Sequence, residues 1–343
     1  MTLANAYTRT RSLANKPGTW RLYQRCLREV IQFMRTTKMI IFPVVDDTTA
    51  KSLCLFFTHL KLKGTSWAKM ATFRSALTNA SRAAGLHNPW KRYPRLEELS
   101  AGLSRELTTP TTRREGMTIK MVKRVIAHIE AQMEKHTAAG NVKRADTALR
   151  NLVAICLGFF AMRRGSELWL NKSRRMGLRR CQVELVWGSH VVLFIQSMKN
   201  DTTAKGTEVV VAWVTASGVR IGDYIARLHH RLDECGIPMT GPFFCATGTK
   251  GSDGFVVPAR GKESRFNGIL AKYLAQIWSE FEDKELRKRF SWHSLRRGGA
   301  SWAHRMRVDI RMIMGHGAWR SEAGVAPYLS ADLLGKLAVT LSM

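Results

Sequence analysis

The chain has 343 residues, 45% of them hydrophobic and 24% charged, which is enough for two domains that each bury a core. Its 55 Lys and Arg residues against 26 Asp and Glu residues give a formal net charge of +29, spread over both halves: +12 in residues 1–110 and +17 in residues 111–343. A protein this basic throughout is suited to nucleic acid. An anionic membrane surface is the other class of partner, but the sequence has no long apolar span and no signal-peptide h-region after Met1.

The cysteines predict reduced thiols in an intracellular protein. None of the six forms a C-x-x-C pair, and no histidine lies at zinc-finger spacing from one. Most of them lie among apolar residues, where a free thiol behaves as a small hydrophobic side chain. We therefore expect no metal site and no cofactor.

The first part of the chain predicts a basic, all-helical domain over residues 1–108. Apolar residues recur at steps of three and four in residues 18–36, and three further helices follow before Thr108. Asp46 precedes the second of them and is a suitable N-cap. Residues 109–117, TPTTRREGM, have no apolar periodicity and predict a linker.

Residues 118–343 predict a second domain that mixes helices with a small antiparallel sheet. Two helices come first, and the second, up to Phe160, is apolar on nearly all faces and should be buried. Alternating residues then predict strands around Gly188 and over 209–211. The polar stretch 197–206 between the last two strands predicts a hairpin loop that carries Lys199 and Lys205. A further helix is expected over 266–281.

Two arginines follow the buried helix directly. Arg163 and Arg164 precede Glu167, and buried guanidinium groups need an anionic partner or an exit to water. One interpretation is a helix end whose cations complement the helix dipole and Glu167. The other is an arginine at the rim of a pocket that binds phosphate.

The most informative stretch is near the C-terminus. His293 and Arg296 lie one turn apart at the start of a predicted helix, and apolar residues continue at helical spacing to Met314. Trp319 and Tyr328 follow. These residue types are poor metal ligands but can hold a phosphodiester and attack it. Taken alone, His-x-x-Arg also fits a basic helix start on a DNA-binding face, and Tyr328 also fits an ordinary half-buried tyrosine.

The combined pattern resembles that of the tyrosine recombinases, the phage-integrase family. Arg164 and Glu167 match the family's R-x-[SA]-E motif, Lys199 its β-hairpin lysine, and His293 and Arg296 its H-x-x-R motif. Trp319 precedes Tyr328 by nine positions, as in family members that have tryptophan in place of the second histidine. The motifs cover the second domain, whereas the first domain matches in architecture only.

The resemblance implies a fold and an activity. The fold would be mainly α-helical with a small antiparallel sheet, with a core-binding domain at 1–108 and a catalytic domain at 118–343. The activity would be site-specific DNA recombination without metal, through a 3′-phosphotyrosine on Tyr328. Arg164, Arg296 and Trp319 would stabilise the transition state, and Glu167 would orient an arginine or the histidine. Lys199 would be the general acid, and His293 would accept the tyrosine proton or bind phosphate.

Some assignments remain open. Arg163 adjoins Arg164, Lys205 competes with Lys199, and His316, in a Gly-His pair, competes with Trp319 although it lies twelve residues before Tyr328. The leucine-rich residues 331–343 predict a short apolar helix, which could cap its own domain. The resemblance implies instead that this helix docks into a neighbouring protomer of a tetramer on paired inverted-repeat sites. A catalytically silent integrase-derived DNA-binding protein and a type IB topoisomerase-like enzyme are the alternative functions.

Overall fold

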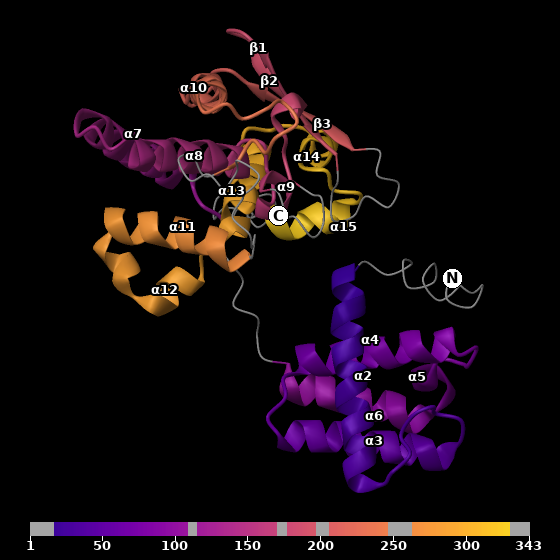
Figure 1. Ribbon diagram of the computed structural model, residues 1–343. Helices are drawn as coiled ribbons and strands as arrows, with labels where there is room; N and C mark the ends of the chain where they lie inside the picture. Colours follow the sequence, from indigo (N-terminus) through magenta and orange to yellow (C-terminus); the bar gives the residue numbers. More distant parts are fainter. Residues whose placement is uncertain (1–16, 109–114, 170–176, 197–205, 246–262, 330–343) are drawn as a thin grey trace, which may run out of the picture. The chain divides into compact units, whose positions relative to one another are not determined.

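The computed structural model describes residues 17–108, 115–169, 177–196, 206–245 and 263–329. The chain divides into two compact units, Met1–Thr111 and Thr112–Met343 (Figure 1). The division falls inside the stretch 109–117 that the sequence marks as a linker. No helix in the described ranges combines the length and the apolar character needed to cross a membrane.

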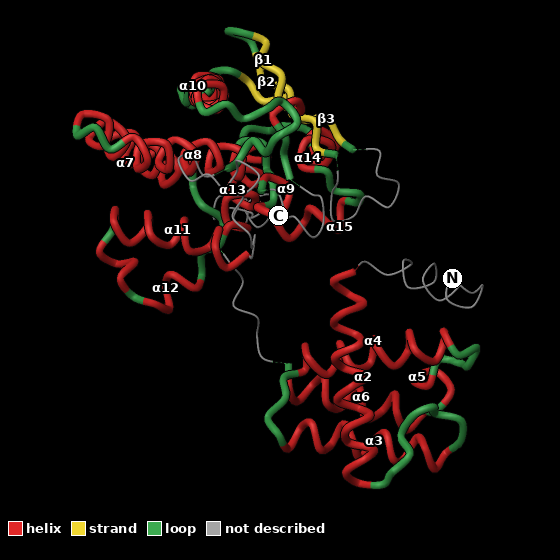
Figure 2. The backbone as a smooth tube through the Cα atoms, in the orientation of Figure 1, coloured by secondary structure: helices red, strands yellow, loops and turns green. Residues whose placement is uncertain are grey.

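The described part of the first unit is helical (Figure 2). Its elements are α2 (Pro17–Thr37), α3 (Asp47–Leu62), α4 (Trp67–Ala83), α5 (Pro89–Arg92) and α6 (Pro94–Leu107). Asp46 caps α3 by accepting a hydrogen bond from the backbone N–H of Thr49 at 2.7 Å. The apolar faces meet in one core in which Phe56 packs edge-on against both Phe57 and Phe73.

The second unit is built on two antiparallel helices, α7 (Ile119–Ala138) and α8 (Val142–Phe159). Every residue of α8 from Asn151 to Phe159 is buried, as its apolar sequence predicts. Around α8 lie α10 (Ile221–Glu234) and α13 (Trp292–Arg305). The remaining helical elements are α9 (Gly165–Leu168), η1 (Arg180–Gln182), α11 (Glu263–Ile277), η2 (Ser279–Glu282), α12 (Lys284–Lys288), α14 (Ile310–Gly317), α15 (Glu322–Val325) and η3 (Ala326–Tyr328).

A three-stranded antiparallel sheet completes this unit, with strand order β1 (Val183–Val186), β2 (His190–Ile195) and β3 (Thr207–Ala212). The register pairs Val191 with Val211 and Leu193 with Val209. These four side chains are buried on one face, as the alternation in the sequence predicts. The mainly helical architecture with a small antiparallel sheet is therefore confirmed.

Two predicted elements differ from those observed. The helix expected over 266–281 ends at Ile277, and Trp278 is extended before the short η2. The apolar spacing that continues to Met314 is divided between α13 and α14, because Arg307 has a left-handed backbone with φ of 60°. Met306 falls at this break and is 57% exposed. The apolar periodicity of the sequence thus continues across a turn between two helices, and only the backbone conformation reveals that turn.

Candidate active site

Helix α13 positions His293 and Arg296. Ser291 and Ser294 form a capping box at its first turn, and the N–H of Ser291 donates to Ser294 Oγ at 3.0 Å. Gly299 lets the helix backbone press against the end of α8, since a Cβ there would lie 2.0 Å from the carbonyl oxygen of Phe159. The close packing of α13 on α8 thus fixes where Arg296 lies.

Three arginines cluster around one carboxylate beside α13. Arg164 Nη1 lies 2.9 Å from Glu167 Oε1, and Arg163 Nη1 lies 3.9 Å from Glu167 Oε2. Arg296 donates to the carbonyl oxygens of Met162 at 2.6 Å and Gly317 at 2.7 Å. In the described part of the chain, no second carboxylate forms an ion pair with these arginines. The cluster therefore carries excess positive charge.

The three guanidinium groups differ in accessibility. Arg163 and Arg296 are completely buried, whereas the Arg164 side chain is 14% exposed. Burial, followed by the positive charge of Arg164, lowers the pKa of Arg296 to about 9, and burial also lowers the pKa of Arg163. An anion bound at this cluster would relieve that electrostatic cost.

Trp319 lies against both Arg296 and Tyr328. Its ring centroid is 3.9 Å from Arg296 Cζ and 5.2 Å from the ring of Tyr328. Gly317 makes room for the indole, because a Cβ there would lie 1.6 Å from it. The ring of His293 lies 6.4 Å from that of Tyr328. One compact group thus holds a phenol, an imidazole, an indole and a guanidinium. Helix α13 carries His293 and Arg296, Trp319 lies between α14 and α15, and Tyr328 follows in η3 (Figure 1 labels α13, α14 and α15).

The indole N–H of Trp319 is buried and has no hydrogen-bond acceptor within the described residues. A buried donor without an acceptor is costly, and an incoming ligand oxygen would satisfy it. This feature fits an indole that donates to a bound phosphate.

His316 contacts the end of α8 and Arg163. Its Nε2 lies 2.8 Å from the carbonyl oxygen of Phe160, and its own carbonyl accepts a hydrogen bond from Arg163. Burial lowers the pKa of His316, so the ring is neutral at pH 7. Its ring is thus engaged at the end of α8, while Trp319 is the residue in contact with Arg296 and Tyr328.

Several predicted residues lie outside the described ranges. These are Lys199 and Lys205 of the hairpin loop, and the C-terminal segment 331–343. Sequence reasoning also missed two contacts. Arg297 and Ser301 of α13 donate to backbone carbonyls of the turn that carries Tyr328. Nothing in their spacing indicates this, because the partners are 27 and 30 residues away.

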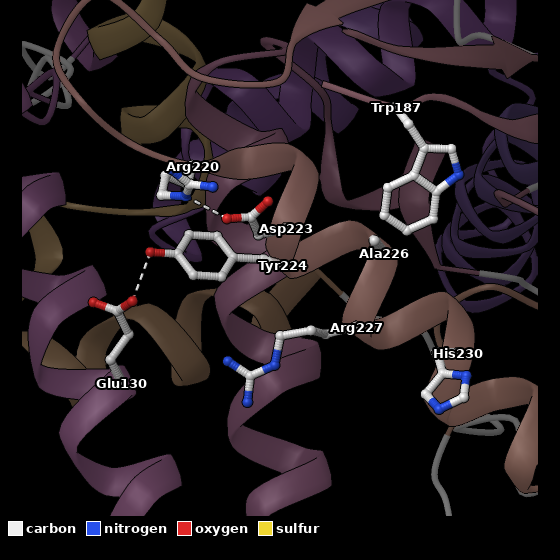
Figure 3. Close-up of a pocket in the computed structure, with 8 residues that line it drawn as sticks. All are labelled: Glu130, Trp187, Arg220, Asp223, Tyr224, Ala226, Arg227 and His230. Carbon is white, nitrogen blue, oxygen red and sulfur yellow. Dashed lines mark hydrogen bonds and ion pairs between the residues drawn. The ribbon is translucent and has the colours of Figure 1, made fainter. Parts of the chain in front are cut away.

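A separate hollow of about 600 Å³ lies along α10 and shares no residue with this group (Figure 3). It is lined by Glu130, Trp187, Arg220, Asp223, Tyr224, Ala226, Arg227 and His230. Tyr224 donates to Glu130 at 2.6 Å, and burial together with that bond raises the pKa of Tyr224. A tyrosine that holds its proton more tightly is a poorer nucleophile than usual. This hollow therefore does not compete with Tyr328 for the proposed chemistry.

The described residues contain no group of three or more His, Cys, Asp and Glu side chains placed to hold a metal ion. The sequence matches no protein-family model and no curated protein.

Solved structures do match the fold. The Tn1549 transposon integrase, in complex with transposon right-end DNA, has 14% identity and a TM-score of 0.54, over 100% of this chain and 99% of that one. The XerH site-specific recombinase bound to difH DNA has 13% identity and a TM-score of 0.54, over 88% and 73%. A lambda integrase dimer bound to a core site has 12% identity and a TM-score of 0.50, over 96% of both chains. Across both of its units, the chain has the fold of the tyrosine recombinases.

Proposed function

We propose that this protein is a site-specific DNA recombinase that cuts and rejoins DNA through Tyr328. The observation that carries the proposal is the contact of Trp319 with both Tyr328 and Arg296, within an arginine cluster of excess positive charge. A nucleophilic phenol beside such a cluster is suited to attack a phosphodiester. The fold neighbours named above were solved with DNA, which supports DNA as the substrate.

The reaction conserves the energy of the phosphodiester bond. The phenolic oxygen of Tyr328 attacks phosphorus, the bond to the 5′ oxygen breaks, and the strand stays attached as a 3′-phosphotyrosine. A 5′ hydroxyl from another strand can then attack the phosphotyrosine, rejoin the DNA and release the tyrosine. His293 accepts the phenolic proton or binds phosphate, and Lys199 protonates the leaving 5′ oxygen as general acid.

Arg164 and Arg296 stabilise the negative charge of the phosphate in different ways. Arg164 is the accessible guanidinium and contacts the nonbridging oxygens of the phosphate, while Glu167 orients it. Arg296 lies beneath Trp319 and contributes its charge from the buried side. The indole N–H of Trp319 adds one hydrogen bond to the phosphate. No step requires a metal ion.

The first unit binds the DNA flanking the cleavage site through its basic helices, and residues 109–117 link it to the catalytic unit. Four copies assemble on two inverted-repeat sites, with the segment 331–343 of each docked into a neighbour. The protein acts inside the cell on DNA, and a mobile element is its natural setting.

Covalent trapping tests the proposal. The protein is incubated in EDTA with nicked, end-labelled fragments of genomic DNA and then denatured, and any protein–DNA adduct is mapped by mass spectrometry. The wild type should give an adduct on Tyr328, and Tyr328→Phe should give none. Tyr93→Phe removes the same hydroxyl from the first unit and should leave the adduct intact.

The outcomes separate the alternatives. DNA binding without an adduct would contradict cleavage and leave a catalytically silent DNA-binding protein. An adduct accompanied by relaxation of any supercoiled plasmid, with no recombinant products, would indicate a type IB topoisomerase-like enzyme. Recombinant products between two copies of the mapped site establish the recombinase.

A further inference from the structure

The turn that carries Tyr328 is bound to α13 through two consecutive backbone carbonyl groups. The guanidinium of Arg297 donates to the carbonyl oxygen of Pro327. The hydroxyl of Ser301 donates to the carbonyl oxygen of Tyr328 itself, at 2.5 Å. The peptide groups on both sides of the Tyr328 α-carbon are therefore held by side chains of one helix.

The turn is also closed internally. The backbone N–H of Leu329 donates to the carbonyl oxygen of Ala326 at 3.1 Å. Pro327, the second residue of η3, has a φ angle that its ring restricts. The backbone of residues 326–329 thus has little freedom once the α13 side chains are in place.

The two donors share a face of α13, since Arg297 and Ser301 are four residues apart. Arg296 precedes Arg297 and points instead to the carbonyls of Met162 and Gly317. One helix therefore holds the buried guanidinium on one side and the backbone of Tyr328 on another. A rigid helix that carries both fixes their separation.

The Ser301 contact is the better defined of the two. Ser301 is only 7% exposed, so water competes little for the carbonyl of Tyr328. Removal of the hydroxyl would leave that carbonyl without this donor, and the turn could then shift. Arg297 is more exposed than Ser301 and carries a positive charge that attracts DNA, so its variants need a control for charge.

We propose that Ser301 and Arg297 are positioning residues for the nucleophile. They touch none of the reacting atoms. They fix the backbone of Tyr328 so that its phenolic oxygen meets a phosphodiester held by Arg164. This inference rests on the proposed recombinase function, and it makes the cleavage rate depend on two side chains that the family motifs do not include.

Single-turnover cleavage at saturating DNA measures this effect. Because misplacement of a reacting group by about 1 Å costs on the order of 100-fold in rate, Ser301→Ala should slow adduct formation by roughly 10- to 100-fold. Its DNA affinity should stay within about twofold of the wild type. Ser301→Thr keeps the hydroxyl and should restore most of the rate, which a merely structural role for the small side chain does not predict.

Arg297→Gln is compared with Arg305→Gln, which removes the same charge from the exposed last turn of α13. Both variants should weaken DNA binding to a similar extent, because each loses one cation. Only Arg297→Gln should also slow cleavage by DNA-saturated protein.

Hydrogen exchange gives a readout that does not depend on activity. Backbone amides in residues 322–329 should exchange faster in Ser301→Ala and Arg297→Gln than in the wild type or Arg305→Gln. If these amides in Ser301→Ala exchange at the wild-type rate, while the wild-type protein forms its DNA adduct normally, the positioning role is overturned and the recombinase function stands. Slow cleavage by both Ser301→Ala and Ser301→Thr would also overturn it. Absence of an adduct in the wild type would overturn both proposals.

Discussion

The guanidinium carbon of Arg296 lies 3.9 Å from the ring centroid of Trp319, so the indole covers one of the two completely buried guanidinium groups of the site. The same indole lies 5.2 Å from the ring of Tyr328. Trp319 therefore does two things. It shields Arg296 from water, which strengthens the field that this charge would exert on a bound anion, and it packs against Tyr328, the proposed nucleophile.

Trp319→Phe keeps an aromatic face over Arg296 but removes the indole N–H. Loss of one donor to a developing charge costs on the order of 100-fold in rate. We therefore expect single-turnover cleavage to fall by about that factor. Trp319→His restores a ring N–H and should recover part of the loss, and the measurement is adduct formation at saturating DNA.

His316→Gln is the matched control for that prediction. Glutamine retains an N–H donor for the carbonyl of Phe160, which His316 contacts at 2.8 Å. Cleavage should stay near the wild-type rate. If His316→Gln is slow and Trp319→Phe is not, the third donor of the site is His316.

Arg163 and Arg164 should respond differently to the same substitution. Arg163 is completely buried and donates to the carbonyls of Ala161 and His316. Lysine cannot bridge both carbonyls, so Arg163→Lys should lower the free energy of unfolding by roughly 2 kcal/mol. Arg164→Lys keeps a cation near Glu167 but loses the bidentate fork, so it should slow cleavage by about 100-fold with little change in stability.

Urea unfolding and cleavage per folded molecule check this pair. A stable but inactive Arg163→Lys, beside a fully active Arg164→Lys, would move the catalytic assignment to Arg163. The sequence alone could not show which of the two arginines is buried and which is accessible. The directions of adjacent side chains after a helix end depend on the backbone conformation, which the sequence pattern does not give.

Other features of the fold could be predicted from the sequence for physical reasons. The burial of α8 follows from apolar residues on all its faces, and the buried face of the sheet follows from alternation in β2 and β3. The contacts of Ser301 and Gly317 were not readable, because they depend on how chain segments far apart in sequence meet. Patterns of period 2 or 3.6 report which face is buried, whereas a hydrogen bond between a helix and a distant turn leaves no such period.

Stability should fall on mild acidification. Burial lowers the pKa of His316 from its ordinary value of 6.5, so the unfolded chain binds a proton at a pH where the folded chain does not. The free energy of unfolding then decreases as pH falls through 6.5 toward the lower folded pKa. His229, whose pKa burial also lowers, adds a contribution of the same sign.

Unfolding in urea at pH 7.5 and pH 5.5 measures the decrease. His316→Gln should show a smaller decrease than the wild type, and His229 should account for part of what remains. Carboxylates whose pKa lies below the usual range, such as Asp233, titrate at lower pH and should not contribute in this window. An unchanged decrease in His316→Gln would contradict the assignment.

The general acid can be assigned by changing the leaving group. If Lys199 protonates the 5′ oxygen, Lys199→Ala should slow cleavage by about 100-fold. A substrate with sulfur at that bridging position leaves as a thiolate and needs no proton, so the variant should cleave it near the wild-type rate. Lys205→Ala serves as the comparison, and rescue seen for Lys205→Ala instead would assign the role to Lys205.

Gly299→Ala tests whether the approach of α13 to α8 sets the site. The added Cβ would lie 2.0 Å from the carbonyl oxygen of Phe159, so the helix must move. We expect a loss of roughly 3 kcal/mol in the free energy of unfolding. Cleavage per folded molecule should fall as well, because Arg296 and Ser301 move with the helix.

Gly268→Ala provides the control within the same unit. Gly268 lies inside α11, and an added Cβ there would meet no atom within 4 Å. Alanine favours the helix by up to about 1 kcal/mol over glycine, so this variant should be as stable as the wild type or slightly more stable, with unchanged cleavage. A Gly299→Ala protein that matches it in stability and rate would show that the close contact between α13 and α8 does not determine the geometry of the site.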